Sequence, residues 1–437
     1  MKEPKVKKTV LGNGIRLLTS LMPQVKSVAV LVLVEVGSRY EDEKTNGLAH
    51  FYEHLVFRGT KKYPSQKELA LAVETIGAKY NAETAKDYMA YWVKAEASHL
   101  ETVLKVLSQM VGAALLKPRA IVQEKPIILE EINMREDTPE TKVYDSLVET
   151  VFINHPLGLP GAGEKKAIKR FARKDFLEFQ AKYYTGKNIV ITLAGNSQIS
   201  DKIQDLVSRY FGRLPEGKQG KFKTFSRLPR SPQFPRLKLI EKPTDQTHLA
   251  LGFTGFGRQA RKNRYAQAML NMILGVGFSS RLFQKVREEK SLAYYIQSEV
   301  DIFKETALLA VAAGVDKKKT GEALNTILDE IRALRKFAPQ SAELRRAKDF
   351  LRGNWVLSLE DSLYQAYWYG LDELFENRLR PPEEIFELVE EVTLDDIIRV
   401  ARQIFTPQNL SLAVVGDGLK EENLKEILFS NFSNWSH

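Results

Sequence analysis

Short apolar runs alternate with amphipathic stretches along this chain, and the pattern predicts strands and helices in alternation. The run Val28–Val34 is continuously apolar, and the segment IVITLAG at residues 189–195 is of the same kind, which is typical of buried strands. Residues 172–196, ARKDFLEFQAKYYTGKNIVITLAGN, predict a helix and a short turn before this second strand. We therefore expect an α+β fold.

The same pattern returns about 220 positions later. Residues 172–196 and 393–417 both predict a helix, a short turn and a strand, and they align at an offset of 221. Residues 27–37 match residues 247–257 at an offset of 220. Two nearly equal offsets favour an internal duplication over chance, so we expect two related α+β halves.

A stretch without helical or alternating period lies near the middle of the chain. Residues 213–236 hold four of the 17 prolines and seven basic residues against one acidic residue, which is the composition of a linker. We therefore expect a first domain over residues 1–215, a linker over residues 216–235 and a second domain over residues 236–437.

The composition excludes several classes of protein. With 43% hydrophobic and 27% charged residues, the sequence has the profile of a folded protein. It contains no cysteine among 437 residues, which excludes disulfide frameworks, thiolate metal sites and a cysteine nucleophile. Any metal must therefore be held by histidine, aspartate or glutamate.

Charge and hydropathy bear on partners and location. The net charge of +10 comes from lysines and arginines that are scattered among acidic residues, without a basic motif interleaved with aromatic residues. We therefore expect a mixed solvated surface and no nucleic-acid partner. The N-terminal region lacks the apolar core of a secretion signal, and the longest apolar run, Val28–Val34, is too short for a bilayer. We expect a cytoplasmic protein that does not bind a membrane.

The segment with the most chemical content is HFYEH at residues 50–54, in a stretch that predicts a helix with its N-cap at Asn46. His50 and His54 are four positions apart, so both imidazoles lie on one helix face and can converge on one cation. Glu53 shares that face. Only six histidines occur in the chain, and two of them are here.

A zinc site of the catalytic kind has three protein ligands and a fourth position open to water. A second predicted helix, VQEKPIILEEINMRE, offers Glu124, Glu130 and Glu131 as the third donor. Helical spacing from two isoleucines directs Glu131 towards the packed face, and Glu124 lies two turns earlier on the same stripe. The residues alone leave the choice open, because glutamate more commonly lies on a solvated helix face.

The order His-x-x-Glu-His is the inverse of the common zinc peptidase motif and is known as the inverzincin motif. With its context GLAHFYEH, it resembles the zinc metallopeptidase family of pitrilysin, insulin-degrading enzyme and mitochondrial processing peptidase. That family's third ligand is a glutamate 77 positions after the second histidine, preceded by a glutamate seven positions earlier. The resemblance therefore implies His50, His54 and Glu131 as ligands of one Zn²⁺ per chain, with Glu124 orienting a ligand. Pro126 lies between the two glutamates and predicts a kink that makes the role of Glu124 less secure.

The resemblance covers essentially the whole chain and implies its fold. Each half is expected to be an αβ roll like that of mitochondrial processing peptidase, a mainly antiparallel sheet with helices packed on one side. At the position of the motif in the second half, residues 270–274 read LNMIL, which cannot bind a metal. The second half is therefore a divergent copy with another task.

The resemblance also assigns roles to further residues. Glu53 is the general base rather than a ligand. The stretch GAKYNAETAKD matches an exposed edge strand in which Asn81 and Ala82 bind a substrate that adds as an extra strand. In the second half, Arg287 and Tyr294 match a pair that holds substrate carbonyls, and the tyrosine hydroxyl helps to stabilise the oxyanion as a second catalytic group.

These residues predict a zinc endopeptidase that hydrolyses unfolded or short peptides. The alternative is a non-catalytic scaffold or partner subunit of a processing-peptidase-like assembly, although such subunits usually lack part of the motif that is intact here. Single-chain members of the family enclose a chamber with four such domains, and this chain has the length for two. We therefore expect a homodimer in which the metal domain of one chain faces Arg287 and Tyr294 of the other.

Overall fold

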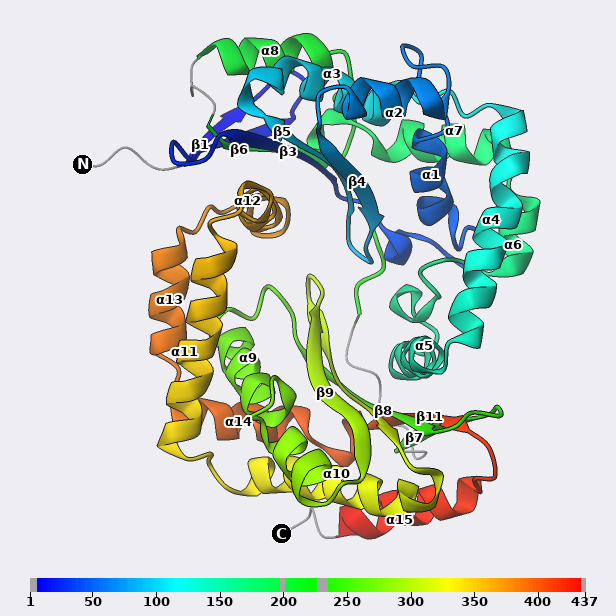
Figure 1. Ribbon diagram of the computed structural model, residues 1–437, viewed down its shortest axis with the longest axis vertical. Helices are drawn as coiled ribbons and strands as arrows, with labels where there is room; N and C mark the ends of the chain where they lie inside the picture. The colour runs from blue at the N-terminus through cyan, green and yellow to red at the C-terminus, as the bar shows by residue number, and fades with distance from the viewer. Residues whose placement is uncertain (1–5, 197–200, 226–234, 434–437) are drawn as a thin grey trace. The chain divides into compact units, whose positions relative to one another are not determined.

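The computed structural model describes residues 6–196, 201–225 and 235–433. The chain divides into two compact units, each built around its own sheet (Figure 1). Unit 1 comprises Met1–Ile132, Leu159–Lys223 and Trp355–Arg380, and unit 2 comprises Asn133–Gly158, Thr224–Asn354 and Pro381–His437. The predicted α+β fold is confirmed. In the described part of the chain, no helix combines the length and the apolar character needed to cross a bilayer.

Unit 1 is built on a six-stranded sheet of order β1-β2-β6-β3-β5-β4. Neighbouring strands are antiparallel except β2 and β6, which are parallel. The strands are β1 (Val6–Val10), β2 (Arg16–Leu21), β3 (Ser27–Val34), β4 (Lys79–Thr84), β5 (Met89–Glu96) and β6 (Ile189–Gly195).

Helices of the first half of the sequence pack on one face of this sheet, with α3 against β5 and α1 against β4. The helices of this half within unit 1 are α1 (Leu48–Val56), α2 (Gln66–Glu74), α3 (Leu100–Gly112), α6 (Lys165–Arg170), α7 (Arg173–Tyr183) and α8 (Asp201–Phe211), with short 3₁₀ turns η1 (Ser38–Tyr40), η2 (Ala97–His99) and η4 (Gly186–Asn188). Helix α4 (Pro118–Asp137) begins in unit 1 and ends in unit 2.

Strand β3 shows why the run Val28–Val34 is continuously apolar. Alternate residues point to opposite faces of a strand, and both faces of β3 are buried. Val30 and Val32 belong to the core on the side of helices α1 and α3. Leu31 and Leu33 belong to a separate core formed with α12 (Ser362–Glu376) on the other face.

Unit 2 is built on a five-stranded sheet of order β7-β11-β8-β10-β9, in which only β7 and β11 are parallel neighbours. Its strands are β7 (Arg236–Glu241), β8 (Thr247–Phe256), β9 (Ala293–Ile302), β10 (Thr306–Val315) and β11 (Ser411–Gly416). Its helices are α5 (Pro139–Val151), α9 (Arg261–Gly275), α10 (Thr320–Lys336), α13 (Pro382–Glu390), α14 (Leu394–Ile404) and α15 (Glu421–Ser433), with the π-helical η5 (Phe283–Glu289) and the short turns η3 (Pro156–Gly158), η6 (Lys317–Lys319) and η7 (Pro407–Asn409). Helix α11 (Ser341–Ser358) begins in unit 2 and ends in unit 1.

The predicted duplication is visible element by element. Strands β3 and β8 correspond, as do β6 and β11, and helix α7 corresponds to α14. Each of these pairs is separated by about 220 positions in the sequence, as predicted.

The compact units differ from the two predicted halves by one exchanged helix each. Helix α12 belongs to the second half of the sequence but covers the sheet of unit 1, and α5 belongs to the first half but packs on β8 and β11 of unit 2. Each sheet therefore carries one helix on the face opposite the predicted helical layer, because both faces are apolar and must be covered. Of the predicted linker, residues 216–223 lie in unit 1, residues 224 and 225 lie in unit 2, and residues 226–234 fall outside the described residues.

Candidate metal centre

Helix α1 presents its two histidines because its other side is anchored in the core. Phe51 and Tyr52 are buried, and the ring centroid of Phe51 lies 4.8 Å from that of Phe176 in α7. Residues at helical spacing on the opposite side point away from this core. His50 and His54 lie there and are half-buried.

The N-terminus of α1 is held by Glu41 rather than by Asn46. The N-cap residue is Gly47, in the left-handed region at φ 92°. The buried carboxylate of Glu41 accepts hydrogen bonds from the backbone N–H of Gly47 (2.8 Å) and Ala49 (2.7 Å) and from Nδ2 of Asn46 (3.2 Å). Burial raises the pKa of Glu41 to about 7 despite these three donors. A carboxylate at this end also interacts favourably with the helix dipole.

Three side chains from α1 and α4 converge. Nε2 of His50 lies 3.3 Å from Nε2 of His54. Carboxylate oxygens of Glu131 lie 3.6 Å from Nε2 of His50 and 3.6 Å from Nε2 of His54. In the described part of the chain, these three residues are the one group of histidines and carboxylates close enough to share a metal ion. Of the three glutamates that the sequence left open, Glu131 is the one in this group.

The spacing of these atoms fits a zinc ion. Nitrogen and oxygen ligands bind zinc at about 2.0–2.2 Å in a tetrahedral arrangement, which puts the ligand atoms roughly 3.3–3.6 Å from one another. The three measured separations lie in this range. Two imidazoles and one carboxylate are also the donor set of catalytic zinc sites.

Glu124 lies behind His54, on the side away from the other two ligands. Its Oε1 is 3.0 Å from Nδ1 of His54, and its Oε2 accepts from Nε of Arg58. Burial opposes the ionisation of Glu124, but the hydrogen bonds from His54 and Arg58 outweigh it and lower the pKa. Helix α4 runs through Pro126 without interruption, so the proline does not prevent Glu124 from reaching His54.

Glu53 lies on the same side of α1 as His50 and His54. Its side chain is hydrogen-bonded to the sheet and not to these two histidines. Its Oε2 accepts a hydrogen bond of 2.5 Å from Oγ1 of Thr84, the last residue of β4. Burial raises the pKa of Glu53, and the bond from Thr84 opposes this effect. Glu53 is therefore held as an acceptor beside the His50–His54–Glu131 group.

Strand β4 is an edge strand, as predicted. It pairs with β5 on one side and stands at the end of the strand order. Ala82 is buried, facing the same way as Thr84, whereas Asn81 is exposed. Backbone N–H and C=O groups along the outer side of such a strand are available to an added strand.

The turn between β4 and β5 is fastened to the segment that precedes α1. Arg39 is fully buried and forms an ion pair of 2.6 Å with Asp87 in this turn, and its backbone N–H donates to the carbonyl of Lys86. Two residues later comes Glu41, which holds the start of α1. Four further residues at this site were not expected from the sequence to take part in it, and they are Arg39, Glu41, Thr84 and Arg58. Of these, only Arg58, four positions after His54, stood at a spacing that would predict contact with the motif if the helix continued, but α1 ends at Val56.

Arg287 and Tyr294 lie in unit 2, whereas the His50–His54–Glu131 group lies in unit 1. Arg287 is exposed in the π-helical segment, with its guanidinium 5.0 Å from the centre of the Phe283 ring. Tyr294 is 61% exposed on β9, the edge strand of its sheet. The neighbouring Tyr295 instead donates or accepts at Nδ1 of His248, 3.1 Å away.

In the second half, leucine occupies the positions that correspond to the candidate metal ligands and to Glu124. At the offset of 220, the positions of His50, His54, Glu124 and Glu131 are occupied by four leucines, which are Leu270, Leu274, Leu344 and Leu351. All four are buried. The corresponding position in this copy is therefore part of a hydrophobic core.

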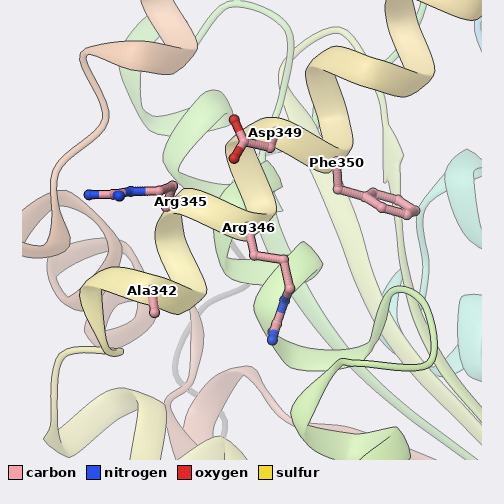
Figure 2. A pocket seen from close by; sticks show the side chains of 5 residues that line it. All are labelled: Ala342, Arg345, Arg346, Asp349 and Phe350. Carbon is pink, nitrogen blue, oxygen red and sulfur yellow. The ribbon is translucent and has the colours of Figure 1, made fainter.

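Unit 2 also has a surface pocket of about 600 Å³ along α11. The five side chains that line it all come from this helix and project in different directions from it (Figure 2). They are Ala342, Arg345, Arg346, Asp349 and Phe350. Its lining surface is mostly apolar although two arginines and one aspartate contribute to it, and it shares no residue with the His50–His54–Glu131 group.

The chain matches two family models that together cover most of its length. Residues 16–165 match the model described as insulinase, peptidase family M16, and residues 170–351 match the model described as the peptidase M16 inactive domain. The boundary between the two matches falls within the first half of the sequence.

Relatives of similar length are named as proteases. An uncharacterized zinc protease of Bacillus subtilis is 33% identical over 411 residues, which are 94% of this chain and 98% of the relative. An uncharacterized zinc protease of Mycobacterium tuberculosis is 33% identical over 425 residues, 97% of this chain and 95% of the relative. Among solved structures, a protease from Helicobacter pylori superimposes with a TM-score of 0.87 at 25% identity, over 94% of this chain and 99% of that one.

Proposed function

Because this chain belongs to peptidase family M16, the insulinase family, we propose that it is a zinc-dependent endopeptidase that hydrolyses unfolded or short peptides. The relatives named zinc proteases support the reaction class. The observation that carries the proposal is the convergence of His50, His54 and Glu131, with spacings that fit a tetrahedral zinc ion.

The roles of the residues follow from their positions. His50, His54 and Glu131 hold the ion, which when bound supplies Lewis acidity that activates water and polarises a carbonyl. Glu124 accepts the Nδ1 proton of His54 in a hydrogen bond, so that Nε2 is left as the donor atom. Hydrogen bonds from His54 and Arg58 keep Glu124 ionised.

Glu53 acts as the general base. Its Oε2 accepts from Thr84, and Oε1 takes the proton of the attacking water and later delivers it to the leaving amine. Its raised pKa favours the first of these steps, because a stronger base accepts the proton of the attacking water more readily.

The substrate is bound through its backbone. A peptide adds to the free side of β4 near Asn81 and Ala82, and hydrogen bonds to the main chain accept many sequences. Arg287 and Tyr294 bind substrate carbonyls, and both side chains are exposed and accessible. We further propose that the protein is a homodimer in which these two residues complete the site of the partner chain.

A test of this function combines metal analysis with a cleavage assay. We expect about one zinc ion per chain, cleavage of an unstructured peptide, loss of cleavage with a zinc chelator and recovery when zinc is added back. The matched control is Glu53→Gln, which should hold zinc without cutting. Absence of both zinc and cleavage would instead support the hypothesis of a non-catalytic subunit. The presence of His50, His54 and Glu131 together argues against that hypothesis.

A further inference from the structure

We propose that Thr84 is a positioning residue for Glu53. One strand, β4, then positions both the bound peptide and the general base. This inference rests on the proposed function, because it gives Thr84 a part in that reaction. It concerns a contact between β4 and α1. The two residues in contact, Thr84 and Glu53, are 31 positions apart in the sequence.

The side chain of Thr84 is directed at α1 by the pleat of the strand. Residues Tyr80, Ala82 and Thr84 share one face of β4, and that face packs on α1, where Tyr80 lies 6.0 Å from Phe57 between ring centroids. Asn81 is exposed on the opposite face. The hydroxyl of Thr84 therefore points at α1, and the outer backbone edge of the same strand remains available to a substrate.

The hydrogen bond restricts a side chain that is otherwise free to rotate. The terminal torsion of a glutamate is broad and nearly two-fold, so its carboxylate does not fix its own orientation. The 2.5 Å bond from Oγ1 of Thr84 to Oε2 of Glu53 selects one orientation and assigns the second oxygen, Oε1, to the attacking water. Correct orientation of reacting groups contributes strongly to catalysis, and a misplacement of about 1 Å can lower the rate about a hundredfold.

The strand that carries Thr84 is itself held in place relative to α1. The turn that follows β4 is joined to Arg39 through Asp87, and the same segment reaches the N-terminus of α1 through Glu41. Both ends of the contact between Thr84 and Glu53 are therefore fixed by a second, independent connection. A peptide that pairs with β4 is placed by the same element that places Oε1 of Glu53.

The test compares Thr84→Val, which removes the hydroxyl at nearly constant shape, with Thr84→Ser, which keeps it. We expect Thr84→Val to lower kcat about ten- to hundredfold with KM and zinc affinity changed less than about twofold. Thr84→Ser should restore kcat to within about threefold of the original protein. The matched control is Thr75→Val in the same unit, whose exposed hydroxyl bonds to the carbonyl of Leu71 and which should cut normally.

A second measurement uses the metal-free protein and is independent of activity. In a double-mutant cycle with Glu53→Ala, Thr84→Val should lower the urea midpoint when Glu53 is present and have a smaller effect when it is absent. Three results would overturn the positioning role. Thr84→Val could have a normal kcat, or its zinc affinity could fall by the same factor as its kcat. The third result is a Thr84→Ser protein that is as slow as Thr84→Val. If the original protein binds zinc and cuts nothing, the proposed function fails instead, and the cycle in the metal-free protein still shows whether the contact exists.

Discussion

His54 and Glu124 are 70 positions apart in the sequence and are joined by a hydrogen bond of 3.0 Å between Nδ1 and Oε1. Hydrogen bonds from His54 and Arg58 lower the pKa of Glu124 despite its burial, so Glu124 is the acceptor and Nδ1 of His54 donates. In the neutral imidazole, Nε2 is then the unprotonated nitrogen, and it lies 3.3 Å from Nε2 of His50 and 3.6 Å from a carboxylate oxygen of Glu131. One bond between α1 and α4 thus sets the tautomer of the neutral side chain of a proposed metal ligand.

The first prediction concerns this bond. Glu124→Gln keeps an acceptor for His54 but removes the negative charge and turns an amide towards Arg58. We expect zinc affinity to fall about ten- to hundredfold, as is usual when a group that orients a ligand is changed. Competition with a chromophoric chelator measures the affinity. An unchanged affinity would mean that Glu124 does not support His54.

The second prediction separates two adjacent glutamates on α4. Glu131→Ala should lower zinc occupancy strongly, because it removes one of the three ligands, and His50→Ala or His54→Ala should do the same. Glu130→Ala is the matched control, since Glu130 is exposed on the same helix and lies outside the ligand group. Elemental analysis of each purified variant gives the occupancy. Zinc loss in Glu130→Ala with retention in Glu131→Ala would move the third ligand by one residue.

The third prediction concerns the base. Glu53→Gln should retain zinc, because residue 53 is not in the ligand group, and should lower kcat about 10²- to 10⁴-fold because the amide cannot take a proton. Steady-state cleavage of an unstructured peptide and metal analysis of the same sample check both parts. Normal cleavage by this variant would exclude Glu53 as the base.

How far the sequence could predict the site depends on the range of each contact. Residues on one helix face, such as His50 and His54, follow from spacing alone. Glu131 required the family's spacing between its ligands, since Glu124 and Glu130 had the same chemistry. Thr84 was out of reach, because its contact with Glu53 depends on how β4 packs on α1, and no local pattern encodes that approach.

The fold shows the same limit. The strands and helices can be predicted from hydrophobic spacing. The exchange of α5 and α12 between the units cannot, because the apolar face of a helix carries no information about which sheet it will cover. Pro126 lies inside α4, and the helix continues on both sides of it. Ile121, Ile128 and Ile132 of this helix pack in the core of unit 1, and this packing favours the helix although a proline removes one of its hydrogen bonds.

The fourth prediction follows from the buried carboxylate of Glu41. Its pKa is raised from 4.5 to about 7, so between these two pH values the folded protein holds a proton that the unfolded chain has lost. The contribution of Glu41 to the free energy of unfolding therefore falls as pH rises through this window, by at most about 3 kcal/mol. Glu41→Gln cannot titrate and should lack this slope.

Urea unfolding of the metal-free proteins at pH 5 and pH 8 measures this effect without the pH dependence of zinc binding. Other acidic groups contribute equally to both proteins and cancel in the difference. A stability difference between the original protein and Glu41→Gln that is the same at both pH values would show that Glu41 titrates as an ordinary carboxyl group.

The last prediction tests whether the active site is completed across a dimer. His54→Ala removes a metal ligand in unit 1, and Arg287→Ala removes a substrate-binding side chain in unit 2, so each variant alone should be inactive. In a mixed dimer, the Arg287→Ala chain supplies an intact metal centre, and the His54→Ala chain supplies an intact Arg287–Tyr294 pair. If Arg287 and Tyr294 act on the partner chain, one of the two sites in each mixed dimer is complete. After subunit exchange about half of the dimers are mixed, so the mixture should recover up to about a quarter of the original activity. Exchange is verified with differently tagged chains, and a mixture of each variant with itself is the control. If exchange is complete and the mixture remains inactive, Arg287 and Tyr294 act within their own chain, and the site is not shared between subunits.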